Sequence, residues 1–361
     1  MVPPRSAAVP ASPLQTLLAL AALVVIAAGM KAASSLLIPF LLAGFITVIC
    51  LPALNGLKAR GLPGWLAITT ILLVLLIGGY LLMVVLTASL DGFLSRLPRY
   101  EQRLELLVDD LRPALLRMGV DEEWLDAPRI LQPATLMSLL GSLAGGVRVM
   151  LSHGLVVFLT VVFLLLEAHT LPGRIRSIAR DPDRTSELLS GFVHDLYRYL
   201  GIKTLTSLFT GLLIGIWLWL FQVDFALLWG VLAFLLNFIP TIGSLVAAVP
   251  GILVALIQHG PGTALWVLGG YIVVNQVIGS LIEPKVLGDR LGLSALVVFV
   301  SLVFWGWILG PVGMFLAVPL SMMLKIALAS HPRTEPIARL ISAEPARGAS
   351  QSFGTPGSTR S

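Results

Sequence analysis

The most regularly spaced polar residues of this sequence interrupt an otherwise apolar run; they are Gln276, Gly279, Ser280 and Glu283. Their spacing of i, i+3, i+4 and i+7 predicts one face of a helix over 263–282, with Asn275 at its margin. Amide, hydroxyl and carboxyl groups can bind a solute through hydrogen bonds. A polar stripe on an apolar helix should face protein or water rather than lipid. The amides of Asn275 and Gln276 are therefore expected to line a pathway or to pin a helix contact.

Two roles are consistent with the position of Glu283 in the sequence. It precedes Pro284 and Lys285, so a plain ion pair at the membrane interface would account for it. An ionisable group beside a transmembrane span can equally gate or couple transport. The sequence does not choose between them.

A second polar feature breaks a long apolar stretch at Asn237-Phe-Ile-Pro-Thr-Ile-Gly243. The run stops at Pro240, turns through Thr241 to Gly243, and resumes through Pro250. Neither arm comfortably reaches the roughly 20 residues that a membrane-crossing helix needs. Backbone freed at membrane depth is tolerated only inside protein or beside a wet cavity. This break is thus the strongest indication of a working site.

The break has a shorter echo near the C-terminus. Gly243–Pro250 resembles Gly313–Pro319, and the second segment follows Gly310-Pro311 as the first follows Pro240. Paired hydrophobic segments interrupted by Pro or Gly indicate the binding site of a transporter. Small residues at helical spacing can also serve close packing alone.

Composition assigns the chain to membranes. Of its 361 residues, 57% are hydrophobic and 12% charged, against about 25% charged in soluble domains. Basic residues lie scattered over loops and tails, which disfavours nucleic acid as a partner. The phosphate-binding loop of ATPases is missing and catalytic motifs are poor, so we expect neither an enzyme nor a cofactor. The partners expected are a lipid bilayer and a small-molecule or ionic substrate.

The pattern predicts an all-α, polytopic membrane protein of about eight to ten hydrophobic segments, some broken or re-entrant. The expected divisions are a disordered tail over 1–13, three transmembrane helices over 14–90, amphipathic extramembrane helices over 91–150, a transport core over 151–330 and a disordered cytoplasmic tail over 331–361. A signal peptide competes with a retained first helix at 14–30.

Basic loops at 55–64, 169–203 and 283–290 predict the cytoplasmic side and place both termini there. Residues 91–150 then face the opposite side. Whether each broken element crosses twice or re-enters does not alter this orientation, because both have the same parity.

The sequence of residues 195–325 resembles that of a known family. The segments NFIPTIG, AAVPG and IEPKVLGDRLGLSALVVFVSLVFWGWILGPVGMFLAVPL resemble the autoinducer-2 exporter (AI-2E) family of bacterial permease-like proteins. The resemblance implies an oligomeric secondary transporter in the bacterial inner membrane. Some members would export small signalling molecules and others exchange Na⁺ for H⁺. Its pattern falls on Asn237, Pro240, Gly243, Pro250, Gln276, Glu283, Pro284, Gly288, Gly292, Gly310, Gly313 and Pro319.

The expected function is export of a small solute or signalling molecule without an ATPase of its own. In the mechanism that we expect, Pro240 and Pro311 stop two helices, the freed backbone contacts the solute, and Gly243 and Gly313 allow close approach or hinge motion. The alternatives are a Na⁺(Li⁺)/H⁺ antiporter and a non-transporting scaffold that acts through 91–150.

Overall fold

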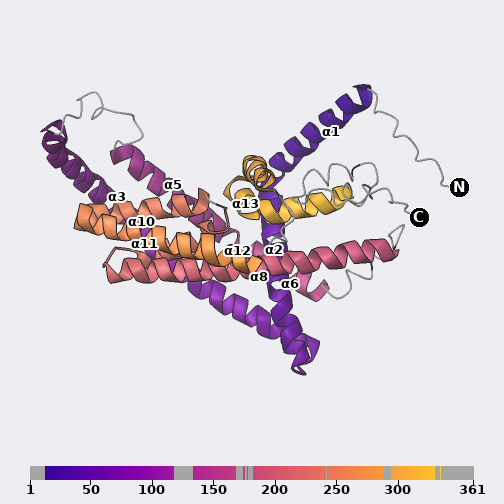
Figure 1. Ribbon diagram of the computed structural model, residues 1–361. Helices are drawn as coiled ribbons and strands as arrows, with labels where there is room; N and C mark the ends of the chain where they lie inside the picture. Colours follow the sequence, from indigo (N-terminus) through magenta and orange to yellow (C-terminus); the bar gives the residue numbers. More distant parts are fainter. Residues whose placement is uncertain are drawn as a thin grey trace, which may run out of the picture.

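The computed structural model describes residues 13–117, 133–167, 174, 177, 182–240, 242–287, 294–329 and 334. Within them every regular element is helical, which confirms the predicted all-α class (Figure 1). The helices of the N-terminal part are α1 (Pro13–Ala32), α2 (Ser34–Ala59), α3 (Gly64–Arg117), α5 (Pro133–Ser152) and α6 (Gly154–Glu167). Those of the C-terminal part are α8 (Pro182–Leu220), α9 (Ala226–Leu236), α10 (Ile242–His259), α11 (Pro261–Asn275), the π-helix η2 (Gln276–Ile282), α12 (Glu283–Leu287) and α13 (Ala295–Ala329).

Six helical segments of the described chain are long and apolar enough to cross a membrane: Ser34–Ala59, Gly64–Leu107, Val193–Leu220, Ile242–His259, Pro261–Val286 and Leu296–Ala329. Shorter apolar helices lie at Ala21–Ala32, Gly154–Glu167 and Ala226–Leu236. The chain is therefore a polytopic membrane protein. Helix α9 has 11 residues and spans about 16 Å, roughly half of a hydrocarbon core.

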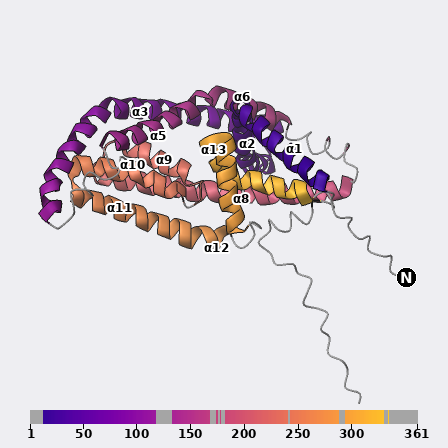
Figure 2. The same ribbon diagram turned by 90° about the horizontal axis from the view of Figure 1, so that it is seen from above.

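The predicted third span does not end where its hydrophobicity falls. Helix α3 runs without interruption for 54 residues, through the charged stretch that begins at Asp91. Pro98 and Pro113 lie inside it, and proline bends a helix because it removes one backbone hydrogen bond. The long purple helix changes direction along its length (Figure 2). The division at 90/91 remains a prediction about membrane depth, because the helix itself is continuous there.

Helices α8, α10 and α11 run alongside one another and form the core of the C-terminal half (Figure 1). Helix α9 lies against α8 through glycines: a Cβ at Gly211 would stand 2.7 Å from the carbonyl oxygen of Gly230, and one at Gly230 would stand 3.0 Å from the Cα of Gly215. Small residues let two backbones approach this closely in lipid, where no hydrophobic force holds helices together. The Gly211-x-x-x-Gly215 pair therefore fixes α9 against α8.

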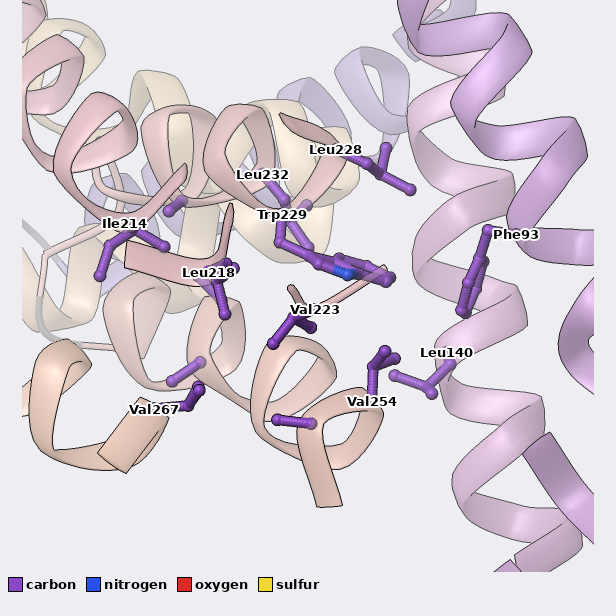
Figure 3. Packing of buried hydrophobic residues seen from close by; sticks show 14 of the residues in the cluster. Phe93, Leu140, Ile214, Leu218, Val223, Leu228, Trp229, Leu232, Val254 and Val267 are labelled. Carbon is purple, nitrogen blue, oxygen red and sulfur yellow. The ribbon is translucent and has the colours of Figure 1, made fainter. Parts of the chain in front are cut away.

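Two buried apolar clusters join the N-terminal helices to the C-terminal helices. In the first, Phe93 of α3 and Leu140 of α5 pack with Trp229, Val254 and other buried residues of α8–α11 (Figure 3). The Phe93 and Trp229 rings meet edge to face at 5.0 Å. The second cluster joins α2, α6 and α8 to α13. The N-terminal helices are thus packed on the C-terminal core from two sides.

The helix expected over 263–282 changes type part of the way along. It is α-helical to Asn275 and then a π-helix from Gln276 to Ile282, where the N–H of Glu283 bonds the carbonyl oxygen of Ile278. Pro284 follows at once; having no N–H, it cannot continue the regular α pattern toward Ser280. The π turn is wider than an α turn, so this segment departs from the α spacing on which the predicted face was based. π turns inside helices occur frequently at functional sites.

Candidate functional site: the core around the two helix breaks

Both predicted breaks are sharp reversals that are built in the same way. A Cβ added at Gly243 would overlap the carbonyl oxygen of Leu236, in the arm before the first break. A Cβ added at Gly313 would overlap the carbonyl oxygen of Trp305, in the arm before the second. Each glycine therefore allows the helix that follows a break to lie on the backbone of the helix before it. The echo noticed in the sequence is also an echo in geometry.

The second break needs a further glycine. Helix α13 is interrupted at Gly310, whose φ of 65° and ψ of −150° lie outside the helical region. That conformation strains residues with a Cβ and suits glycine. Pro311 then begins the second arm. The arms run back along each other, because Ser321 Oγ accepts a hydrogen bond of 3.1 Å from Trp305 Nε1 and donates one of 2.7 Å to Ser301 Oγ.

The two broken elements touch. The rings of Phe238, at the first break, and Phe315, in the second arm of α13, lie 4.4 Å apart between centroids. Ile239 forms a small buried cluster with Leu302 and Ala317, one residue from each arm of α13. Segments that are about 70 residues apart in sequence thus meet at their breaks, as expected of paired discontinuous helices.

Asn237 is buried at the end of α9, where its side-chain amide donates a hydrogen bond of 3.0 Å to Ser207 Oγ of α8. Ser207 is itself fully buried. A buried polar group in an apolar setting is costly unless it is paired. The predicted polar residue of the first break is therefore held by a second polar residue of a different helix.

The ion-pair partner of Glu283 is a lysine of a different helix. Its Oε1 lies 2.6 Å from Nζ of Lys203 in α8, and the two side chains are 20% and 5% exposed. Lys203 was expected to close the cytoplasmic loop 169–203. It instead lies well inside an apolar stretch of α8, Val193–Leu220, and is buried. The ion pair is thus a contact between two core helices, not between neighbours in the chain.

Asn275, the last residue of α11, lines a narrow crevice together with residues of α8, α9 and α10. The other lining residues are Thr210, Ile214, Ala233, Ser244, Ala247 and Tyr271. The prediction that Asn275 faces a pathway or a helix contact is compatible with this position.

These contacts identify a row on α8 that sequence reasoning missed. Lys203, Ser207 and Thr210 are spaced i, i+4 and i+7, so they share one face. All three are buried. They meet Glu283, Asn237 and the crevice beside Asn275 respectively. The signal was present in the sequence as polar residues at helical spacing in KTLTSLFT, a run next to a basic loop.

The remaining predicted residues are divided between surface and interior. Gln276, Ser280, Pro284 and Pro311 are exposed on this single chain, and Pro240 is half-buried. Pro250 lies buried inside α10 and Pro319 buried inside α13. Thr241 and Gly288 fall outside the described residues, as does Gly292 of the family pattern. The structure thus joins Asn237 and Glu283 to α8 and brings the two breaks together, whereas Gln276 and Ser280 remain on an outer face.

Apolar helices, two discontinuous elements in contact and a buried polar row define a polytopic membrane protein of the kind that transports solutes. A family model described as AI-2E family transporter matches residues 20–333, and the chain belongs to that family. This is a family of transporters and not of enzymes.

Relatives extend over nearly the whole chain. A transport protein of Haemophilus influenzae is 40% identical over 334 residues, covering 91% of this chain and 96% of that protein. The AI-2 transport protein TqsA of Escherichia coli is 37% identical over 329 residues, with the same coverage of 91% and 96%. The transport protein YhhT of Escherichia coli is 38% identical over 316 residues, covering 86% of this chain and 89% of that protein.

Proposed function

We propose that this protein exports a small organic solute, such as an autoinducer-2-like signalling molecule, and that it does so without an ATPase of its own. The name of one relative, the AI-2 transport protein TqsA, supports the class of cargo. We further propose that it lies in the bacterial inner membrane with both termini cytoplasmic, and that it works as a homo-oligomer.

One observation supports the location of the pathway best. The buried row Lys203, Ser207 and Thr210 lies beside Glu283, the first break at Asn237, and Asn275. Polar groups within a membrane protein are costly, so they gather where a solute passes or where helices must be held in register. In the mechanism we propose, the two broken elements, α8 and the α11–η2 junction enclose the pathway.

The breaks supply polar backbone to that pathway. The N–H groups of Ile239, Ile242 and Gly243 at the first break are already bonded to carbonyl oxygens of the chain. A passing solute would therefore bond the second lone pair of carbonyl oxygens at the breaks. Gly243 and Gly313 keep the two arms of each broken element close enough to move as a unit. The π-helix η2 is a local departure from regular hydrogen bonding at which α11 can bend.

The test is flux of autoinducer-2 from proteoliposomes that contain only the purified protein. Asn237→Ala and Asn275→Ala should slow flux, and Asn55→Ala, an exposed asparagine of α2, serves as the matched control. Flux that is unchanged in Pro240→Ala, Gly243→Leu and Asn275→Ala would overturn the proposed pathway. A scaffold would give no flux in any variant.

The buried Lys203–Glu283 pair supports a second candidate, a Na⁺(Li⁺)/H⁺ antiporter, because a buried carboxylate can bind a cation or a proton in turn. Glu283→Gln should then abolish cation-dependent collapse of a proton gradient, whereas Glu105→Gln on the exposed face of α3 should leave it intact. Gradient collapse that survives Glu283→Gln would remove this candidate.

The orientation of the chain in the membrane and its oligomeric state are tested by separate measurements. Replacing Cys50, the single cysteine, provides a background without thiols. A cysteine at Val120 should react with an impermeant reagent from outside the cell, and one at Arg184 should not. The reverse pattern would overturn the orientation. The mass of the detergent-solubilised protein, measured by light scattering, tests the oligomer.

A further inference from the structure

Tyr271 lines the crevice between α8, α9, α10 and α11, and its hydroxyl is a buried polar group without a partner among the described residues. The side chain of Tyr271 is 2% exposed, and no described residue forms a hydrogen bond with its hydroxyl. A buried donor with no partner in the protein is uncommon, because it forfeits the hydrogen bond it would make in solvent. The hydroxyl is therefore available to a ligand.

The position of that hydroxyl is fixed by close packing. A Cβ added at Gly251 of α10 would come within 2.7 Å of the Tyr271 oxygen. On the next residue back, a Cβ at Gly270 would overlap the indole ring of Trp217 in α8. Helix α11 is thus held against α10 on one side and α8 on the other. These two close contacts at glycines fix the position of Tyr271 between α10 and α8.

The rest of the lining indicates the kind of ligand. Thr210, Ser244 and Asn275 add hydroxyl and amide groups from α8, α10 and α11. The other lining residues, Ile214, Ala233 and Ala247, are small or apolar, and no lining residue is charged. The Thr210 hydroxyl already donates to the carbonyl oxygen of Thr206, so it can only accept from a ligand, whereas the Asn275 amide can donate and accept. None of these groups can neutralise an ion. The nearest charged pair on the α8 row, Lys203 and Glu283, is already satisfied internally.

The crevice is closed as it stands. Its empty space of about 170 Å³ includes space that is open to the outside, and no part of it is wide enough to admit a water molecule. Entry requires α11 to separate from α8 or α10. Asn275 lies at the junction where α11 becomes the π-helix, so bending at that junction would widen the crevice at its polar end.

We propose that this crevice is the closed form of a solute subsite for a small, uncharged molecule that carries several hydrogen-bonding groups, and that Tyr271 is its central contact. The proposal rests on the proposed transport function and specifies the chemical class of its substrate. An anion or cation would enter without a counter-charge and would be rejected.

Access is tested first, without reference to transport. In a Cys50→Ala background, Thr210→Cys should react much faster with 2-hydroxyethyl methanethiosulfonate than with its 2-sulfonatoethyl counterpart, by tenfold or more. Val254→Cys is the control, because Val254 is equally buried in α10 but does not line the crevice. Equal rates for the two reagents, or no reaction above that of Val254→Cys, would overturn the proposal.

Class of ligand is tested by protection. Erythritol, an uncharged four-carbon polyol, should slow modification of Thr210→Cys, whereas its carboxylate erythronate and the simple alcohol 1-butanol should not. Tyr271→Phe should weaken erythritol protection about tenfold, the value of one hydrogen bond. Lack of protection by erythritol, protection by erythronate, or protection that is unchanged in Tyr271→Phe would each overturn the assignment.

The two levels of proposal can fail separately. Selective protection without autoinducer-2 flux would leave the subsite standing and make the cargo wrong. Autoinducer-2 flux with no protection at Thr210→Cys would keep the transport function and place its subsite elsewhere.

Discussion

Lys203 of α8 donates a hydrogen bond of 2.6 Å to Oε1 of Glu283, 80 residues further along the chain, from a side chain that is 5% exposed. This pair joins the transmembrane helix α8 to the first residue of α12, directly after the π-helix. Taking two charges out of water is costly, and only close pairing offsets that cost. The contact is therefore sensitive to the loss of either partner.

Removing one charge should cost more than removing both. Lys203→Met leaves the carboxylate of Glu283 without its partner, and we expect a loss of about 3 kcal/mol in the free energy of unfolding. The double variant Lys203→Met/Glu283→Gln should recover more than half of it. Thermal unfolding in detergent, followed as a double-mutant cycle, measures both. Additive losses would mean that the two side chains do not interact.

The close backbone contacts at the breaks should not tolerate a methyl group. Gly243→Ala and Gly313→Ala each place a Cβ on a carbonyl oxygen of the preceding arm, and backbone cannot move aside as a flexible side chain can. We expect each to cost about 3 kcal/mol or to prevent folding. Gly269→Ala in α11, where nothing lies within 4 Å, should be neutral or slightly stabilising. Similar melting temperatures for all three variants would contradict the reversal geometry.

The hydrogen bond from Asn237 to Ser207 should contribute to the free energy of unfolding, because both groups are buried. Both groups are buried, so Asn237→Ala leaves a hydroxyl without its partner and should cost about 1–3 kcal/mol in the free energy of unfolding. Ser207→Ala should cost a similar amount, and the double variant should cost little more than either. If the double variant loses the sum of the unfolding free energies lost by the two single variants, the hydrogen bond is absent from the folded protein in the membrane.

The turn between α8 and α9 depends on Asp224. Its Oδ2 accepts hydrogen bonds from Arg96 at 2.6 Å and Tyr100 at 2.8 Å, both on α3. Arg96 is half-exposed, so Arg96→Ala should cost about 0–1 kcal/mol of unfolding free energy. Asp224→Ala loses both contacts and should cost about 2 kcal/mol. Denaturant unfolding of each variant tests this order, and an equal loss in both would contradict it.

Much of the architecture follows from composition and from proline and glycine. The apolar runs predict the helical class, and Pro240, Pro311 and their glycines predict the two breaks, because these residues act through local backbone chemistry. The similarity of the two breaks could also be read from spacing. What spacing could not show is that Phe238 and Phe315 bring them together, since pairing between distant segments depends on the whole packing arrangement.

The polar row on α8 was missed for a related reason. Lys203 follows a run of arginines, and a lysine beside a basic loop is typically a topology signal. Only the packing of α8 against α12 shows that it is buried and paired. Periodicity also assumed 3.6 residues per turn for Gln276–Ile282, where the chain adopts a wider turn. Local pattern predicts elements well but not the register at which they meet.

The wide turns of η2 affect the orientation of the chain that follows them, which begins at Glu283. Each π turn holds about one residue more than an α turn, so the segment contains spare length. Tightening it to regular α would rotate everything downstream about the helix axis by about 100° for each residue taken up. Glu283 is the first residue that such a rotation would carry. Any such tightening would therefore have to break the contact between Glu283 and Lys203.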